Sequence, residues 1–253
     1  MTAHSPKYRA LVSSDWNECL APSGPFDVIT CHHPDLEPAL SEIFRKYTGN
    51  IISFRDAASQ VQALLPSPVT EDRMDAYLEQ SFRTYPGVPE LIAWCLSRDI
   101  LFMINTTGPQ GFFQRLFSKE LIPRVPALSA SPFIRYPHRD TDPDLVYDLF
   151  ETHDKAANTQ AVASAQGIPT DRIIIIGDSG GDGPHFEWGA GVGACLVGSM
   201  TKASLEKYCA ERGINIHVHF GHSYGPDEPR NIEEEMQFNF KELVPVIEKY
   251  AGR

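Results

Sequence analysis

Short apolar runs alternate with amphipathic helical patterns along most of this chain, and that alternation restricts the possible fold more than any other feature. Strands separated by helices build βα units, in which the strands lie parallel in one sheet and helices cover its faces. The sequence therefore predicts a Rossmann-like three-layer α/β core with a mostly parallel sheet. The runs expected to form its strands are residues 10–13, 100–105, 127–130, 172–176, 194–197 and 214–220.

The segment 23–84 departs from this alternation, because it holds three helical patterns and no strand-like run. One pattern begins at Ser53 with Asp56 three residues later, an arrangement typical of a helix N-terminus. Another begins after Thr70. We therefore predict a small helical cap inserted into the α/β core. The predicted division is a core of residues 1–22 and 85–253 and a cap of residues 23–84.

Charge and cysteine content narrow the partners and the compartment that we expect. The formal net charge of −11 repels polyanions and anionic lipid surfaces, which argues against nucleic-acid and membrane binding. A small anionic substrate stays compatible, because a bound cation can reverse the field locally. The five cysteines are odd in number and form no CxxC pair, so we expect reduced thiols and a cytoplasmic protein. No apolar run approaches the ~20 residues that span a bilayer.

Polar residues and glycines follow three of the predicted strands. In an open α/β sheet, ligands bind beyond the carboxyl ends of the strands, so these residues are candidates for one common site. A lysine opens the helical pattern that precedes the strand 172–176 and adds a positive charge. The candidates are Asp15 and Asn17, Thr106, Thr107 and Gly108, Lys155, and Asp178 and Asp182.

These residue types together favour phosphate chemistry. Clustered carboxylates repel one another, and their hard oxygen atoms are ligands that suit Mg²⁺. The metal and Lys155 would neutralise a phosphoryl group, while Thr106 and free backbone N–H groups would bind its oxygens. One carboxylate then remains to attack phosphorus. The sequence therefore predicts an Mg²⁺ cofactor and a small phosphorylated metabolite as the ligand.

The order and spacing from Asp15 to Asp182 resemble the haloacid-dehalogenase-like (HAD) superfamily of hydrolases. That family carries an aspartate nucleophile, a strand-end Ser or Thr, a Lys and an acidic GDxxxD loop, here residues 177–182. The helical insertion resembles the C1 cap of the phosphoserine-phosphatase-like branch. A weaker likeness, in residues 52–66 and 136–138, is to the methionine-salvage phosphatase that acts on a methylthio keto-enol phosphate.

The resemblance implies a role for each matching residue. Asp15 would be the nucleophile that becomes aspartyl-phosphate. Thr106 would bind the phosphoryl oxygens, with Thr107 and Gly108 beside it, and Lys155 would bridge nucleophile and phosphate.

The same resemblance implies a metal site, and the predicted cap separately offers a candidate substrate contact. Asp178 would ligate Mg²⁺ together with Asp15 and the backbone carbonyl of Asn17, and Asp182 would orient the metal or its waters. Arg55 in the cap is a candidate for binding an acidic group of the substrate.

Asn17 stands where phosphatases of this family have a second aspartate, which protonates the leaving group and activates water. An amide does neither, and such acid–base help is typically worth ~10²–10⁴ in rate. Glu18 and His185 are candidates to replace it as proton carriers.

The leading function is Mg²⁺-dependent hydrolysis of a small phosphate monoester, attenuated at Asn17. Two alternatives stay open: a metal-independent dehalogenase, and a catalytically weak protein that binds a phosphorylated ligand. The sequence does not determine the oligomeric state.

Overall fold

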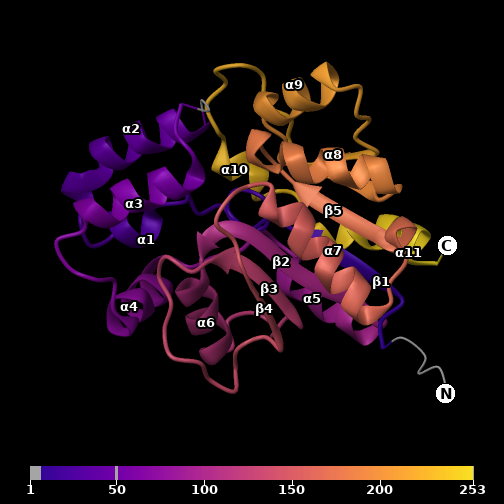
Figure 1. The fold of residues 1–253 in the computed structure, drawn as a ribbon, viewed down its shortest axis with the longest axis horizontal. Helices are drawn as coiled ribbons and strands as arrows, with labels where there is room; N and C mark the ends of the chain where they lie inside the picture. Colours follow the sequence, from indigo (N-terminus) through magenta and orange to yellow (C-terminus); the bar gives the residue numbers. More distant parts are fainter. Residues whose placement is uncertain (1–6, 49–50, 253) are drawn as a thin grey trace.

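A computed structural model describes residues 7–48 and 51–252. Seven parallel strands form one sheet in the order β4-β3-β2-β1-β5-β6-β7, which confirms the predicted α/β class (Figure 1). The strands are β1 (Ala10–Ser14), β2 (Ile100–Pro109), β3 (Ala127–Ser131), β4 (Leu145–Asp148), β5 (Ile173–Gly177), β6 (Cys195–Ser199) and β7 (Val218–Phe220).

The central strands were predictable because both of their faces are covered. β1, β3, β5 and β6 are buried at every position, so they read as continuous apolar or small-residue runs. The edge strand β4 was not predicted, since its residues alternate between partly buried and exposed. The run 214–220 forms a strand only over its last residues, as β7.

Alternate residues of each central strand enter two different apolar clusters, as the period of two along a strand requires. Val12 of β1 packs toward one face and Leu11 toward the other. The first cluster includes α5 (Val88–Ser97), α6 (Gln110–Ser118) and α11 (Val244–Ala251). The second includes α7 (Asp154–Gln166), α8 (Gly183–Val192) and α9 (Ala203–Glu211). None of the helices in the described ranges is long and apolar enough to cross a membrane.

The predicted helices of the segment between β1 and α5 are present. Ser53 accepts a hydrogen bond from the Asp56 backbone N–H at 3.0 Å, and Thr70 caps the following helix in the same way. Figure 1 shows these helices gathered at one side of the molecule, away from the two chain ends. They are α1 (Asp27–Thr30), the 3₁₀ turn η1 (Pro34–Leu36), α2 (Glu37–Thr48), α3 (Phe54–Leu64) and α4 (Glu71–Ser81). The remaining short elements are η2 (Thr170–Arg172), η3 (Gly180–Asp182), α10 (Ile232–Glu235) and η4 (Phe240–Leu243).

Polar contacts hold this helical segment against the core. In α6, the Arg115 guanidinium binds both carboxylate oxygens of Asp75 in α4, at 2.7 and 2.8 Å. The backbone N–H of Phe54, which begins α3, donates to the Glu151 carboxylate at 3.2 Å. Glu151 follows the carboxyl end of β4, so this contact places the start of α3 at the carboxyl edge of the sheet.

Candidate active site

The carboxyl ends of three adjacent strands bring the predicted residues together. Ser14 pairs with Ile104 on one side and with Ile176 on the other, so β1 and β5 end at one level, and β2 continues past it to Pro109. Asp15 is the first residue after β1 and Asp178 the first after β5. Together with Asp182, they offer carboxylate oxygens that all lie within 4.8 Å of one another.

Lys155 joins this group from the start of α7. Its Nζ lies 3.0 Å from Asp15 Oδ1 and 2.6 Å from Asp182 Oδ1, and its side chain is almost wholly buried. The Asn105 amide in β2 donates to the Lys155 carbonyl at 2.9 Å and fixes the helix there. The structure therefore places this lysine between the nucleophile candidate and the acidic loop.

Asp182 differs from the other two aspartates, because both of its oxygens are engaged. Its Oδ2 accepts the backbone N–H groups of Asp178 at 2.9 Å and Ser179 at 3.3 Å, and its Oδ1 faces Lys155. By contrast, Asp178 Oδ1 is buried with no hydrogen-bond partner among residues 7–48 and 51–252, and Asp15 Oδ1 has the Lys155 ammonium at 3.0 Å as its ionic partner. Asp182 is thus built to orient the loop, and the other two carboxylates keep an oxygen for a ligand.

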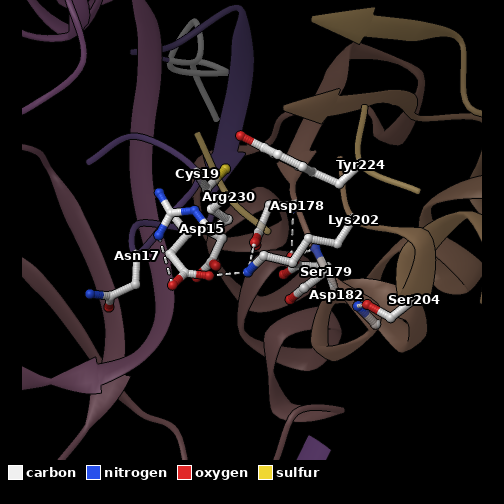
Figure 2. Close-up of polar contacts among 12 residues, drawn as sticks. Asp15, Asn17, Cys19, Asp178, Ser179, Asp182, Lys202, Ser204, Tyr224 and Arg230 are labelled. Atoms are coloured by element: carbon white, nitrogen blue, oxygen red, sulfur yellow. Dashed lines mark hydrogen bonds and ion pairs between the residues drawn. The ribbon is translucent and has the colours of Figure 1, made fainter. Parts of the chain in front are cut away.

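A second lysine, which the sequence analysis missed, contacts the cluster. Lys202 Nζ lies 2.8 Å from Asp178 Oδ2 and also pairs with Glu18, and its backbone N–H donates to the Asp178 carbonyl at 2.7 Å (Figure 2). Lys202 follows β6. It would have been found if the residues after the predicted strand 194–197 had also been taken as candidates for ligand binding. Arg230, in a loop with no such signal, pairs with Glu18 at 2.9 Å and with Glu235 at 2.6 Å.

The charges of this connected cluster do not balance. Burial raises the pKa of Asp15 and of Asp178, while the nearby lysines oppose that rise. Burial lowers the pKa of Lys155, but its two carboxylate partners raise it by more, so the ammonium stays charged. With every group ionised, as metal binding requires, three cations face five carboxylates and the formal charge is −2. The cations are Lys155, Lys202 and Arg230, and the carboxylates are Asp15, Glu18, Asp178, Asp182 and Glu235.

This surplus and the donor set fit a divalent cation. Uncompensated buried charge is costly, and hard carboxylate oxygens are the ligands that Mg²⁺ prefers. The unpartnered Asp178 Oδ1 and a carboxylate oxygen of Asp15 are the atoms that would hold it. The Asn17 carbonyl stays a predicted further ligand.

The loop after β1 and the end of β2 meet beside Asp15. Thr106 Oγ1 accepts the Gly108 backbone N–H at 3.1 Å, and a methyl group at Gly108 would lie 3.1 Å from Asn17 Oδ1. The Asn17 amide donates to the carbonyls of Ser23 and Gly24, each at 3.2 Å. Figure 2 shows this amide directed away from Asp178 and Lys202. Asn17 therefore ties the loop after β1 to the chain that leads into the predicted cap helices.

Arg55, predicted to bind substrate, is not brought to this cluster. It is exposed at the start of α3, and its guanidinium lies 5.3 Å from the centre of the Phe150 ring. A helix start is readable from sequence, but the direction of a long side chain on it is not.

Neither predicted proton carrier is available as a free acid. Glu18 is held by the ion pairs with Lys202 and Arg230, and its φ of 59° places it in the left-handed region. His185 Nε2 is hydrogen-bonded to Thr159 Oγ1 at 3.0 Å, and burial lowers the pKa of His185 to about 3. A histidine in that environment is neutral near pH 7, so the expectation for both residues is corrected.

Solved structures share this fold. A HAD family hydrolase from Salmonella enterica serovar Typhi superposes with a TM-score of 0.67 at 16% identity, over 95% of this chain and 72% of that chain. A phospho-aspartyl intermediate analogue of phosphoserine phosphatase gives 0.65 at 13% identity, over 94% and 99%. A substrate-bound phosphoserine phosphatase complex gives 0.65 at 14% identity, over 94% and 97%. No protein-family model matches the sequence, and the search of curated proteins found no significant match. The comparisons therefore show a HAD-like α/β fold.

Proposed function

We propose that this chain is a cytoplasmic, Mg²⁺-dependent phosphatase that hydrolyses a small phosphate monoester through an aspartyl-phosphate at Asp15. The observation that carries the proposal is the convergence of Asp15, Lys155 and Asp178 at the ends of adjacent elements, with a charge surplus suited to a divalent metal. The odd cysteine count without a CxxC pair supports the compartment. The helices between β1 and α5 would act as a C1 cap that excludes water from the reaction.

The chain's own residues would carry two displacements. Lys155 and the Thr106 hydroxyl bind the phosphoryl oxygens, while an Asp15 oxygen attacks phosphorus and the bond from phosphorus to the leaving alcohol oxygen breaks. Water then attacks the aspartyl-phosphate, which releases phosphate and restores the carboxylate. Mg²⁺, held by Asp15 and Asp178, would supply positive charge next to the transferred group.

Because Asn17 cannot donate a proton, departure of the leaving group should be the slow step for alkyl phosphates. A poorly stabilised alkoxide needs a proton, and neither Glu18 nor His185 is free to give one. Acyl and aryl phosphates, whose leaving groups need little protonation, should therefore suffer less than alkyl phosphates. With acyl and aryl phosphates, whose first step stays fast, hydrolysis of the aspartyl-phosphate should lag its formation, so a burst of the leaving group is expected with those substrates.

The direct test is phosphate release from a panel of acyl, aryl and alkyl phosphates, with Mg²⁺ and with chelator. We expect release that requires Mg²⁺ and that Asp178→Asn abolishes while circular dichroism shows the fold intact. Asp56→Asn, on an exposed part of the cap, is the matched control and should keep full activity. Chelator-resistant turnover, or full activity of Asp178→Asn, would overturn the metal assignment.

Metal-independent dehalogenation is the second candidate, and one observation favours it. Lys202 Nζ lies 2.8 Å from Asp178 Oδ2 and partly neutralises the carboxylate that a metal would otherwise balance. Release of halide from 2-haloacids without Mg²⁺ would support this reading. Phosphate-ester binding without release of either product would support a non-catalytic ligand-binding protein.

A further inference from the structure

An apolar cavity of about 70 Å³ lies between the cap helices and the ends of β2 and β3. None of the side chains that line it carries a formal charge. Most of the lining is aromatic or aliphatic, and its rings come from both sides of the gap: Phe26, Phe44, Tyr47 and Phe54 from the cap, and Phe133 from the core.

The cavity adjoins the reaction centre. Thr107 and Gly108 line it, and they directly follow Thr106 at the end of β2. Tyr47 lines it from α2, and the Tyr47 hydroxyl would lie 3.8 Å from a methyl group placed at Gly181 in the acidic loop. A phosphate ester bound at Asp15 and Thr106 therefore has this cavity beside it for its organic group.

We propose that the substrate's organic group is small, uncharged and largely apolar, an inference that rests on the proposed phosphatase function. An ammonium or carboxylate transferred into such a cavity would lose its hydration and gain no ionic partner. A volume of about 70 Å³ holds roughly five water-sized groups, which suits a short alkyl chain or a small ring.

The same cavity argues against phosphoserine as the substrate, although phosphoserine phosphatases share the fold. Phosphoserine carries both an ammonium and a carboxylate on its organic part, and each needs a partner of opposite charge. Arg55 lies in the first turn of α3, a helix that lines the cavity, yet its guanidinium lies against Phe150 and not in the lining.

Two esters of equal size test this inference. Pentyl phosphate and 4-aminobutyl phosphate have the same number of non-hydrogen atoms and the same kind of leaving alcohol, and they differ in a terminal methyl or ammonium group. We expect kcat/KM to favour pentyl phosphate by at least ~100-fold, because the ammonium would be buried without a partner. O-phosphoserine should be as poor a substrate as the amino ester. Equal rates, or a preference for either charged ester, would overturn the proposal.

A failure of the proposed function is separable from a failure of this inference. If acetyl phosphate, which needs no acid, is not hydrolysed with Mg²⁺, the phosphatase proposal fails. The cavity is then still tested by binding of pentylphosphonate and 4-aminobutylphosphonate, measured by calorimetry. Tighter binding of the pentyl compound supports the cavity assignment, and equal binding of the two refutes it.

A charge placed in the cavity wall sharpens the test. Ala58→Asp puts a carboxylate in the lining from α3, and it should lower the pentyl-to-aminobutyl preference by at least tenfold. Ser59→Asp, at the exposed next position of the same helix, is the matched control and should leave the preference unchanged. If both variants keep the wild-type preference, the cavity does not hold the organic group. The comparison of esters on the unmodified protein stands even if Ala58→Asp does not fold.

Discussion

The core side and the cap side of the proposed active site follow different physical rules. On the core side, Lys155 and Lys202 each sit between carboxylates, and the fully ionised cluster has a formal charge of −2. On the cap side, the cavity lining holds rings and aliphatic groups and no formal charge. Buried charges are stable only with partners, so the core side suits a metal and a phosphoryl group, and the cap side suits an uncharged organic group.

This contrast separates the chemistry from the choice of substrate. Every phosphate ester presents the same group to Asp15 and Lys155, so changes on the core side should alter the rate for all substrates. Changes in the cavity, by contrast, should alter the order of preference among them. The variants below test that separation.

The largest effect is expected at Asp15, the proposed nucleophile. Asp15→Asn removes the attacking oxygen and one metal ligand together, so phosphate release should fall by at least ~10⁴-fold for every ester in the panel. Steady-state phosphate assays with pentyl and acetyl phosphate measure it. A loss confined to one class of ester would contradict the separation of the two sides.

Asn17→Asp should raise alkyl-phosphate turnover by something on the order of 10²-fold, because it restores an acid next to the leaving group. The carbonyls of Ser23 and Gly24, which now accept from the amide, would favour a protonated carboxyl and raise its pKa. The acid form exists below that pKa, so the gain should fade as pH rises through it.

Rate–pH profiles of both proteins with pentyl phosphate provide the measurement for Asn17→Asp. Acetyl phosphate serves as the internal control and should gain little. Flat alkyl-phosphate turnover would mean that another residue already carries the proton, or that Asn17 serves different chemistry.

Lys202→Gln should lower the Mg²⁺ concentration for half-maximal activity by about tenfold. The substitution removes a positive charge 2.8 Å from Asp178, so the carboxylate attracts the metal more strongly. Mg²⁺ titrations of activity measure this, with the exposed Lys207→Gln on the same helix as control. If the wild-type activity does not need Mg²⁺ and is lost in Lys202→Gln, the Lys202 ammonium itself fills the role proposed for the metal.

The smallest effect is expected where the cap meets the core. Asp75→Asn breaks the two-bond contact with Arg115 and should lower the free energy of unfolding by about 1 kcal/mol. For a chain of this size that is a Tm lower by about 3 °C. Asp72→Asn, exposed on the same helix, is the control.

The Asp75 contact also predicts a pH dependence of stability. The hydrogen bonds from Arg115 hold the pKa of Asp75 below its usual value. The stabilisation that this contact gives the folded state is therefore present above the ordinary carboxyl pKa. It is lost as pH falls through the lowered pKa of Asp75. The difference in Tm between wild type and Asp75→Asn should shrink toward acid pH, and a constant difference would contradict the assignment.

Much of the fold was readable from local patterns. The runs that became β1, β2, β3, β5 and β6 are buried on both faces, and continuous burial leaves a strong signal in sequence. β4 at the sheet edge left a weak one, since only alternate positions are partly covered. The capping hydroxyls of Ser53 and Thr70 act within one helical turn, which explains why both helix starts were predicted.

The sequence by itself determined that Asp15 and Asp178 stand at strand ends and that Lys155 stands at the start of a helix, because the end of an apolar run and the start of a helical pattern are local properties. Only the tertiary structure decided that Lys202 pairs with Asp178, that the Asn17 amide turns to the cap linker, and that Arg55 faces outward. These outcomes depend on how segments far apart in the chain pack against one another. Side-chain direction follows from that packing, because a buried charge or amide takes whichever partner the surrounding elements bring within reach.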